Sequence, residues 1–139
     1  MKILFLDDMA ERHAHSREWF GSGCEIVPAY TAPEALGLYL LAQSSRQPFA
    51  LVSLDRDLGA QWTGEDVVDQ ILRLHEAFPG SDFVRPPFAI HSWNIPAAER
   101  MHNRLQWAGF SVARLPFSPP GYERALDDEA LRRTPGAKP

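Results

Sequence analysis

Cysteine is almost absent from this chain, because its 139 residues include a single one, Cys24. One cysteine excludes an internal disulfide framework and a zinc site built from several cysteines, and it fits a reducing compartment. Long apolar runs are also lacking. No segment reaches the roughly 18 apolar residues of a membrane span, and the short apolar run at the N-terminus is followed at once by acids, unlike a secretion signal. We expect a soluble, cytoplasmic protein with an inert thiol and no membrane partner.

Basic residues are not in excess. Lys and Arg number 14 against 18 Asp and Glu, which gives a formal net charge of −4. The broad basic surface that binds long duplex nucleic acid is therefore not expected, and a nucleotide partner would be small or the end of a strand. What is present is ordinary globular composition, with 45% hydrophobic residues in a length suited to one core.

Short apolar runs alternate with helical patterns along the chain. The predicted strands are residues 3–6, 25–30, 49–54, 88–90 and 110–113, and helices are expected in the intervals that follow the first four. Such alternation indicates an α/β fold of three layers, a doubly wound parallel five-stranded sheet in the flavodoxin-like order 2-1-3-4-5. The proline-rich remainder has only a weak helical pattern. We expect a domain at 1–117 with a weak or altered last helix, and a C-terminal extension at 118–139 with a short helix and a loose tail.

Acidic residues follow two of the predicted strands. Asp7 and Asp8 end the first, and Asp55 and Asp57 end the third, which should be its neighbour in the sheet. Carboxylates this close repel one another, and a hard cation with oxygen ligands relieves the repulsion. The sequence therefore predicts a Mg²⁺ or Mn²⁺ site at the carboxyl edge of the sheet. A simpler interpretation stays open for two of these residues: Asp8 as a helix cap and Asp57 in a turn with Gly59.

Other candidates lie at the same edge. His91 follows the fourth strand and is the natural general acid or base, whereas His13, His15, His75 and His102 fall in predicted helices. The other candidates also have structural interpretations. Ser92 could donate to a phosphate or form a turn, Arg56 could bind a phosphate or pair with acids, Asn94 could cap a helix, and Trp62 or Trp93 could stack on a base or form a lid. A core position is more expected for Trp19 and Trp107.

The stretches "ILFLDD", "LVSLD" and "FAIHS" resemble three strands of a response-regulator receiver domain. By that resemblance Asp7 and Asp8 would hold Mg²⁺, Asp55 would face phosphate and Ser92 would be the switch hydroxyl. The fifth strand departs from the pattern. Receivers carry a lysine before a proline there, whereas "ARLPF" has Leu115 in that place and Arg114 before it.

A closer resemblance is to the cyclic-phosphate-processing receiver domains. It is carried by "FLDDMAER", "SLDRDLG", "TGEDVV" and "IHSWNIPAAERM", spread over residues 4–101. The resemblance implies a receiver-like fold that acts on 2′,3′-cyclic phosphates of nucleotides or RNA ends, in RNA repair or related systems. It implies metal and phosphate ligands at Asp7, Asp8 and Asp55. The pocket would be completed by Asp57, His91, Ser92 and Asn94. This family often has a histidine where this chain has Arg56, which leaves His91 as the proton shuttle.

Three hypotheses follow. The first is a metal-dependent phosphoesterase (a cyclic phosphodiesterase) in which His91, Asp55 and Asp57 are catalytic and Arg56, Ser92, Asn94, Trp62 and Trp93 bind substrate. The second is a receiver-like phosphoacceptor that signals through Asp55. The third is a non-catalytic module that binds a nucleotide or a protein. The weak last helix also suggests a bare sheet face and hence a possible homodimer, which sedimentation would test.

Overall fold

A computed structural model describes residues 1–114 of the chain, apart from residues 22 and 93. The elements are β1 (Lys2–Leu6), α1 (Ala10–Phe20), β2 (Glu25–Ala29), α2 (Ala32–Ser44), β3 (Leu51–Leu54), α3 (Gly64–Ala77), β4 (Phe88–Ile90), α4 (Ile95–Trp107) and β5 (Val112–Arg114). The expected domain boundary at 117, the weak last helix and the extension at 118–139 lie outside the described residues. None of the described helices is long and apolar enough to cross a membrane.

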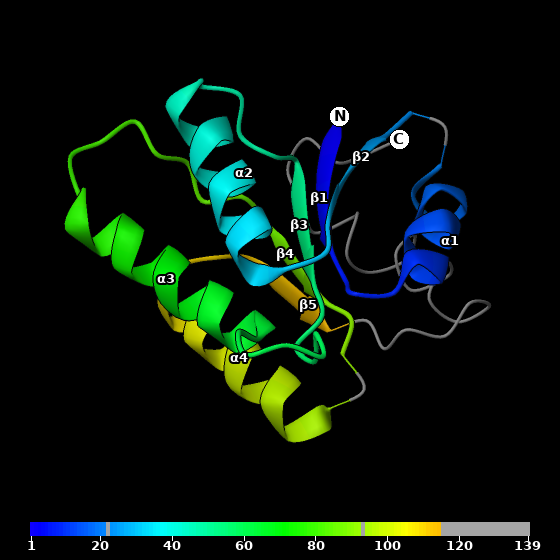
Figure 1. The fold of residues 1–139 in the computed structure, drawn as a ribbon. Helices are drawn as coiled ribbons and strands as arrows, with labels where there is room; N and C mark the ends of the chain where they lie inside the picture. The colour runs from blue at the N-terminus through cyan, green and yellow to red at the C-terminus, as the bar shows by residue number, and fades with distance from the viewer. Residues whose placement is uncertain (22, 93, 115–139) are drawn as a thin grey trace.

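The five strands form one parallel sheet in the order β2-β1-β3-β4-β5, which confirms the predicted fold class. Helices cover it in layers: α2, α3 and α4 pack on one face, and α1 lies on the other (Figure 1). Strands β1, β3 and β4 are apolar on both faces because each face is covered. Pro28 is tolerated in β2 because that strand lies at the edge of the sheet.

The strand register brings three polar residues to one level. Leu6 of β1 pairs with Leu54 of β3, and Leu54 pairs with Ile90 of β4. The ladder then continues one step, since the Asp55 amide donates to the Leu6 carbonyl and the His91 amide donates to the Leu54 carbonyl, both at 3.0 Å. The residues that follow the three central strands are therefore neighbours.

Two predicted strand starts differ from the structure by two residues. The third strand begins at Leu51 rather than at residue 49, and the fifth begins at Val112 rather than at 110. The second difference has a clear cause at the end of α4. Gly109 has φ +93°, and the Phe110 amide bonds back to the Leu105 carbonyl at 3.0 Å while the Gly109 amide bonds to Gln106. This Schellman arrangement holds Phe110 against the core and delays the strand.

One predicted core residue is on the surface. Trp107 is the last residue of α4 and is 91% exposed, so the expectation that it packs in the core is wrong. Core contacts from this end of the helix come from Leu105 and Phe110 instead. Trp19, in the last turn of α1, is buried as expected.

Two glycines predict opposite effects of the same substitution. A Cβ at Gly64 would lie 2.0 Å from the backbone oxygen of Asp55, whereas a Cβ at Gly37 in α2 would meet nothing within 4 Å. We expect Gly64→Ala to lower the free energy of unfolding by about 3 kcal/mol or more, because backbone atoms must shift. Gly37→Ala should raise it by about 0.5–1 kcal/mol through helix propensity. Urea unfolding of both variants tests the packing at the start of α3; equal effects would contradict it.

One buried histidine, His75, contributes a loss of stability on acidification. His75 Nε2 lies 2.6 Å from the Tyr39 hydroxyl, and burial lowers the pKa of His75 below its ordinary value of 6.5. The unfolded chain therefore binds a proton that the folded chain does not, so stability is lost as pH falls below about 6.5. Urea unfolding between pH 7 and 5, in the range of ordinary histidine titration, should show a shallower decline for His75→Gln. Tyr39→Phe is the control: it should be less stable but keep the wild-type pH slope.

Candidate active site

A buried acidic cluster lies at the carboxyl edge of the sheet. The carboxylates of Asp7 and Asp55 and the imidazole of His91 each offer a ligand atom, and these atoms all lie within 4.8 Å of one another. All three residues are buried, with Asp7 and His91 fully enclosed. Register alone explains their approach, because each follows one of three adjacent strands.

A guanidinium lies between the two carboxylates. Arg12 comes from the first turns of α1, and its NH1 atom lies 3.2 Å from Asp7 Oδ2 and 3.4 Å from Asp55 Oδ2. One cationic atom thus contacts both acids. In the sequence Arg12 stands out only as part of the motif "FLDDMAER", which by itself indicates no role for it. The available signal was its place on the helix that begins right after the first strand.

The two carboxylates differ in acidity. Burial, and then the nearby charge of Asp7, raise the pKa of Asp55 to about 7 despite Arg12. Burial also disfavours ionised Asp7, but the hydrogen bond from His91, the Met9 amide at 2.9 Å and Arg12 together hold the pKa of Asp7 below its usual value. Asp7 is therefore ionised at neutral pH, whereas Asp55 ionises fully only if more positive charge is brought near it.

His91 is held on both ring nitrogens. Its Nε2 lies 3.1 Å from Asp7 Oδ2 and its Nδ1 lies 2.8 Å from the Ser53 hydroxyl, while its ring stacks on Phe5. Burial lowers the pKa of His91, which favours the neutral ring. Since ionised Asp7 can only accept, the Nε2 atom carries the proton and Nδ1 accepts from Ser53. His91 thus orients Asp7 and, by donating to it, favours its ionised form.

His13 was predicted to be a surface or core-edge residue, but it is buried beside the cluster. Its Nε2 lies 2.8 Å from the Asp7 carbonyl oxygen, and its ring contacts Phe5 and Tyr30. A hollow of about 450 Å³ adjoins it, lined by Ala10, His13, Ala14, Arg17, Ile26, Pro28 and Tyr30. Helical spacing was the available signal, because His13 lies three residues before Ser16 and seven before Phe20 on the buried face of α1.

The remaining acids of the predicted site lie at its rim. Asp8 is exposed and is not part of the buried cluster, and its Oδ2 lies 3.0 Å from where a Cβ of Gly59 would be. Asp8 does not begin α1, because the cap position is Met9. Asp57 is exposed and its Oδ1 lies 2.8 Å from Arg56 NH1. Gly59, with φ +62°, leaves the space that the Asp8 carboxylate occupies.

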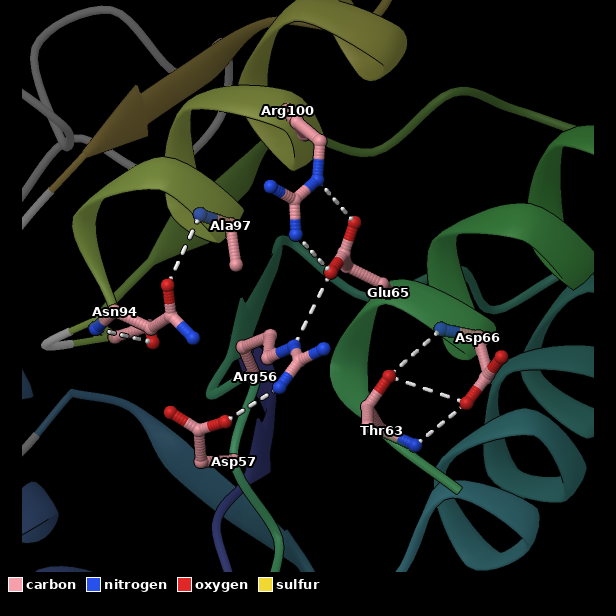
Figure 2. A network of polar contacts seen from close by, with 9 residues as sticks. Arg56, Asp57, Thr63, Glu65, Asp66, Asn94, Ala97 and Arg100 are labelled. Atoms are coloured by element: carbon pink, nitrogen blue, oxygen red, sulfur yellow. Dashed lines mark hydrogen bonds and ion pairs between the residues drawn. The ribbon is translucent and has the colours of Figure 1, made fainter. Parts of the chain in front are cut away.

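Arg56 pairs with acids on both sides. Besides Asp57 it contacts Glu65 at the start of α3, at 3.1 Å, and Glu65 in turn binds Arg100 of α4 through two bonds (Figure 2). This arrangement matches the ion-pair interpretation of Arg56. It also places the guanidinium beside the edge of the sheet, directly after Asp55.

The other predicted substrate-binding residues have local structural roles. Ser92 is buried and its Oγ accepts from the Asn94 amide at 3.1 Å, and Asn94 Oδ1 caps α4 by accepting from Ala97 (Figure 2). Trp62 is half exposed in the loop before α3. Trp93 lies outside the described residues. The structure thus gathers Asp7, Asp55 and His91 at the centre, with Asp8, Asp57, Arg56, Ser92 and Asn94 around the edge.

The residues present fit a divalent cation. Two carboxylates already share one cationic atom, Arg12 NH1, so the position between them is one that positive charge stabilises. Oxygen ligands from Asp7 and Asp55 are those that Mg²⁺ and Mn²⁺ prefer. An ion bound there would replace Arg12 NH1 and would favour ionised Asp55.

Fold and site together define a receiver-like α/β domain with an acidic, metal-compatible centre. A family model described as the cyclic-phosphate processing receiver domain matches residues 2–106, and the chain belongs to this family. This confirms the resemblance drawn from the motifs. Among curated proteins no match is found.

Solved structures similar to this chain share its fold at low sequence identity. One is from the CheX-CheY-BeF3-Mg complex of Borrelia burgdorferi, with 16% identity, TM-score 0.62, and coverage of 86% of this chain and 81% of that one. A sensor protein from Polaromonas sp. JS666 has 18% identity, TM-score 0.62, and coverage of 96% and 98%. The Mn²⁺-bound form of response regulator Rcp1 has 16% identity, TM-score 0.59, and coverage of 93% and 94%.

The position of Arg12 predicts competition with a metal ion. Arg12→Gln should lower the free energy of unfolding of the metal-free protein by about 2 kcal/mol, between the values for exposed and buried ion pairs. Mn²⁺ should then raise the melting temperature of this variant more than that of the wild type, because no guanidinium has to leave. Asp55→Asn should respond little to Mn²⁺. Arg46→Gln, which breaks an exposed pair with Asp82, is the control. Loss of the Mn²⁺ response in Arg12→Gln would refute the competition.

Proposed function

We propose that this protein is a metal-dependent phosphoesterase that opens 2′,3′-cyclic phosphates on nucleotides or RNA ends. The observation that carries the proposal is the pair of buried carboxylates, Asp7 and Asp55, around one cationic position. Membership of the cyclic-phosphate processing family supports the choice of substrate. The Mn²⁺-bound form of Rcp1, which has the same fold, supports a divalent ion without deciding between Mg²⁺ and Mn²⁺.

In this proposal Asp7 and Asp55 hold the ion, and Asp8 reaches it from the rim. When bound, the ion would supply positive charge against the phosphate and lower the pKa of a coordinated water. Hydrolysis forms a bond from the water oxygen to phosphorus and breaks one ring P–O bond, and the leaving ribose oxygen takes the proton that the water loses. Asp55 and the rim residue Asp57 orient the water.

In the proposed reaction His91 keeps Asp7 oriented and ionised. Its Nε2–H group donates to Asp7 Oδ2, so the neutral ring acts through that carboxylate. Among the rim residues, the Ser92 hydroxyl and the Asn94 side chain lie at the start of α4, where they can hold phosphate oxygens. Arg56 faces the same edge, and Trp62 and Trp93 provide surfaces on which a base can stack.

A phosphoacceptor role is the second candidate. It is favoured by the similarity to response-regulator structures and by the position of Asp55 at the end of β3. The absence of a lysine at position 115, where Leu115 stands, weighs against it. In that role Asp55 would become covalently phosphorylated by a small phosphodonor, which the mass of the intact protein would reveal.

The esterase is tested by incubating the protein with Mn²⁺ or Mg²⁺ and either 2′,3′-cyclic nucleotides or RNA ending in a cyclic phosphate. Asp55→Asn and His91→Ala should each lower kcat/KM by at least about 100-fold, the range of lost acid–base or metal-linked assistance. The matched control is Asp82→Asn, which changes an exposed aspartate far along the chain and should keep wild-type activity. Metal-dependent nucleotide binding without turnover would instead favour a non-catalytic module.

A further inference from the structure

We propose that the seam between α3 and α4 binds the backbone of single-stranded RNA that leads to the reacting end. This rests on the proposed function and selects RNA ends over free mononucleotides as its preferred substrates. The seam consists of Arg56, Arg73, Arg100 and Arg104, which contact two acidic residues of α3.

Each carboxylate of the seam is shared by two arginines. Glu65 contacts Arg56 at 3.1 Å and Arg100 at 2.8 Å (Figure 2). One helical turn later, Asp69 contacts Arg73 at 3.0 Å and Arg104 at 2.8 Å. The Asp69 unit has two cations and one anion and retains a positive charge, whereas in the Glu65 unit Asp57 also pairs with Arg56 and makes the unit neutral. The positive charge of the seam is therefore concentrated at Arg73 and Arg104.

The two units repeat in register along the helices. Glu65 and Asp69 are four residues apart in α3, and their partners Arg100 and Arg104 are four residues apart in α4, so the helices run parallel. Four helical residues advance about 6 Å, a repeat comparable to that of phosphates in an extended single strand. The seam therefore offers successive sites to successive phosphates.

The arginines lie outside their acids. The side chain of Arg100 is 55% exposed against 19% for Glu65, and that of Arg104 is 42% exposed against 34% for Asp69. A guanidinium has five N–H donors, and the contacts of Arg100 use its Nε and one terminal nitrogen on Glu65. Donors on the outer side remain able to bind phosphate oxygens.

The seam begins at the site and leads away from it. Arg56 directly follows Asp55, and the first turns of α3 and α4 both lie at the carboxyl edge of the sheet, after β3 and β4. An RNA end with its cyclic phosphate at Asp55 can thus place the preceding phosphates along Arg100 and Arg104. A mononucleotide is too short to make these contacts.

The test compares two substrates: a short single-stranded RNA ending in a 2′,3′-cyclic phosphate, and 2′,3′-cyclic AMP. The wild type should have the higher kcat/KM for RNA, with a rate that falls as salt rises. Arg104→Gln and Arg73→Gln should each lower the RNA-to-mononucleotide ratio of kcat/KM by roughly fivefold, the upper range for an exposed ion pair, and should weaken the salt dependence. Arg46→Gln, an exposed arginine away from the seam, should leave the ratio unchanged.

Asp69→Asn supplies an opposite effect. It releases Arg73 and Arg104 from their shared carboxylate and should raise the ratio, which a purely structural role of the network does not predict. If both substrates are turned over and no seam variant changes the RNA-to-mononucleotide ratio of kcat/KM, the proposed role of the seam is wrong and the proposed esterase activity stands. If the wild type turns over neither substrate, the proposed esterase fails, and binding of the RNA is then measured by fluorescence anisotropy. Weaker binding by Arg104→Gln than by the wild type supports the seam. Equal binding by the two proteins overturns it.

Discussion

The repulsion between two buried carboxylates is the constraint on which the rest of this structure depends. Parallel register brings Asp7 and Asp55 together at the end of β1 and β3, where little water is available to screen them. The fold answers with groups from two further elements. Arg12 of α1 lies between the acids, and His91 after β4 donates to Asp7. The need to compensate these two carboxylates therefore links α1 and β4 to the ends of β1 and β3.

Much of the fold and the centre of the site could be predicted from the sequence. Strands buried on both faces leave uninterrupted apolar runs, and the polar residue that follows each run marks a strand end, which located Asp7, Asp55 and His91. Arg12 and His13 were not placed, because α1 is mostly polar and only Trp19 and Phe20 mark the face that packs on the sheet. Trp107 was misplaced since an aromatic residue near a helix end has the same pattern whether it packs inward or outward.

The site divides its polar groups by depth. At the centre, the carboxylates and the imidazole are enclosed: His91 contacts Asp7 and Ser53, and Asp55 contacts Arg12 of α1. At the rim, charged groups such as Asp57 and Arg56 pair with one another in contact with solvent (Figure 2). Enclosed groups set the affinity for a small cation, because desolvation strengthens their field. Exposed pairs exchange partners at low cost, which suits the recognition of a longer ligand.

The close approach of Gly64 to Asp55 has a mechanical consequence. Since not even a methyl group fits between the first residue of α3 and the Asp55 carbonyl, the two backbones are in direct contact. The Gly64 amide also bonds to the Arg56 carbonyl at 2.9 Å. If the loop that carries Asp55 moves, α3 must move with it, because no side chain lies between the two backbones to absorb the displacement. Binding at the acidic centre and the position of α3 are therefore mechanically coupled.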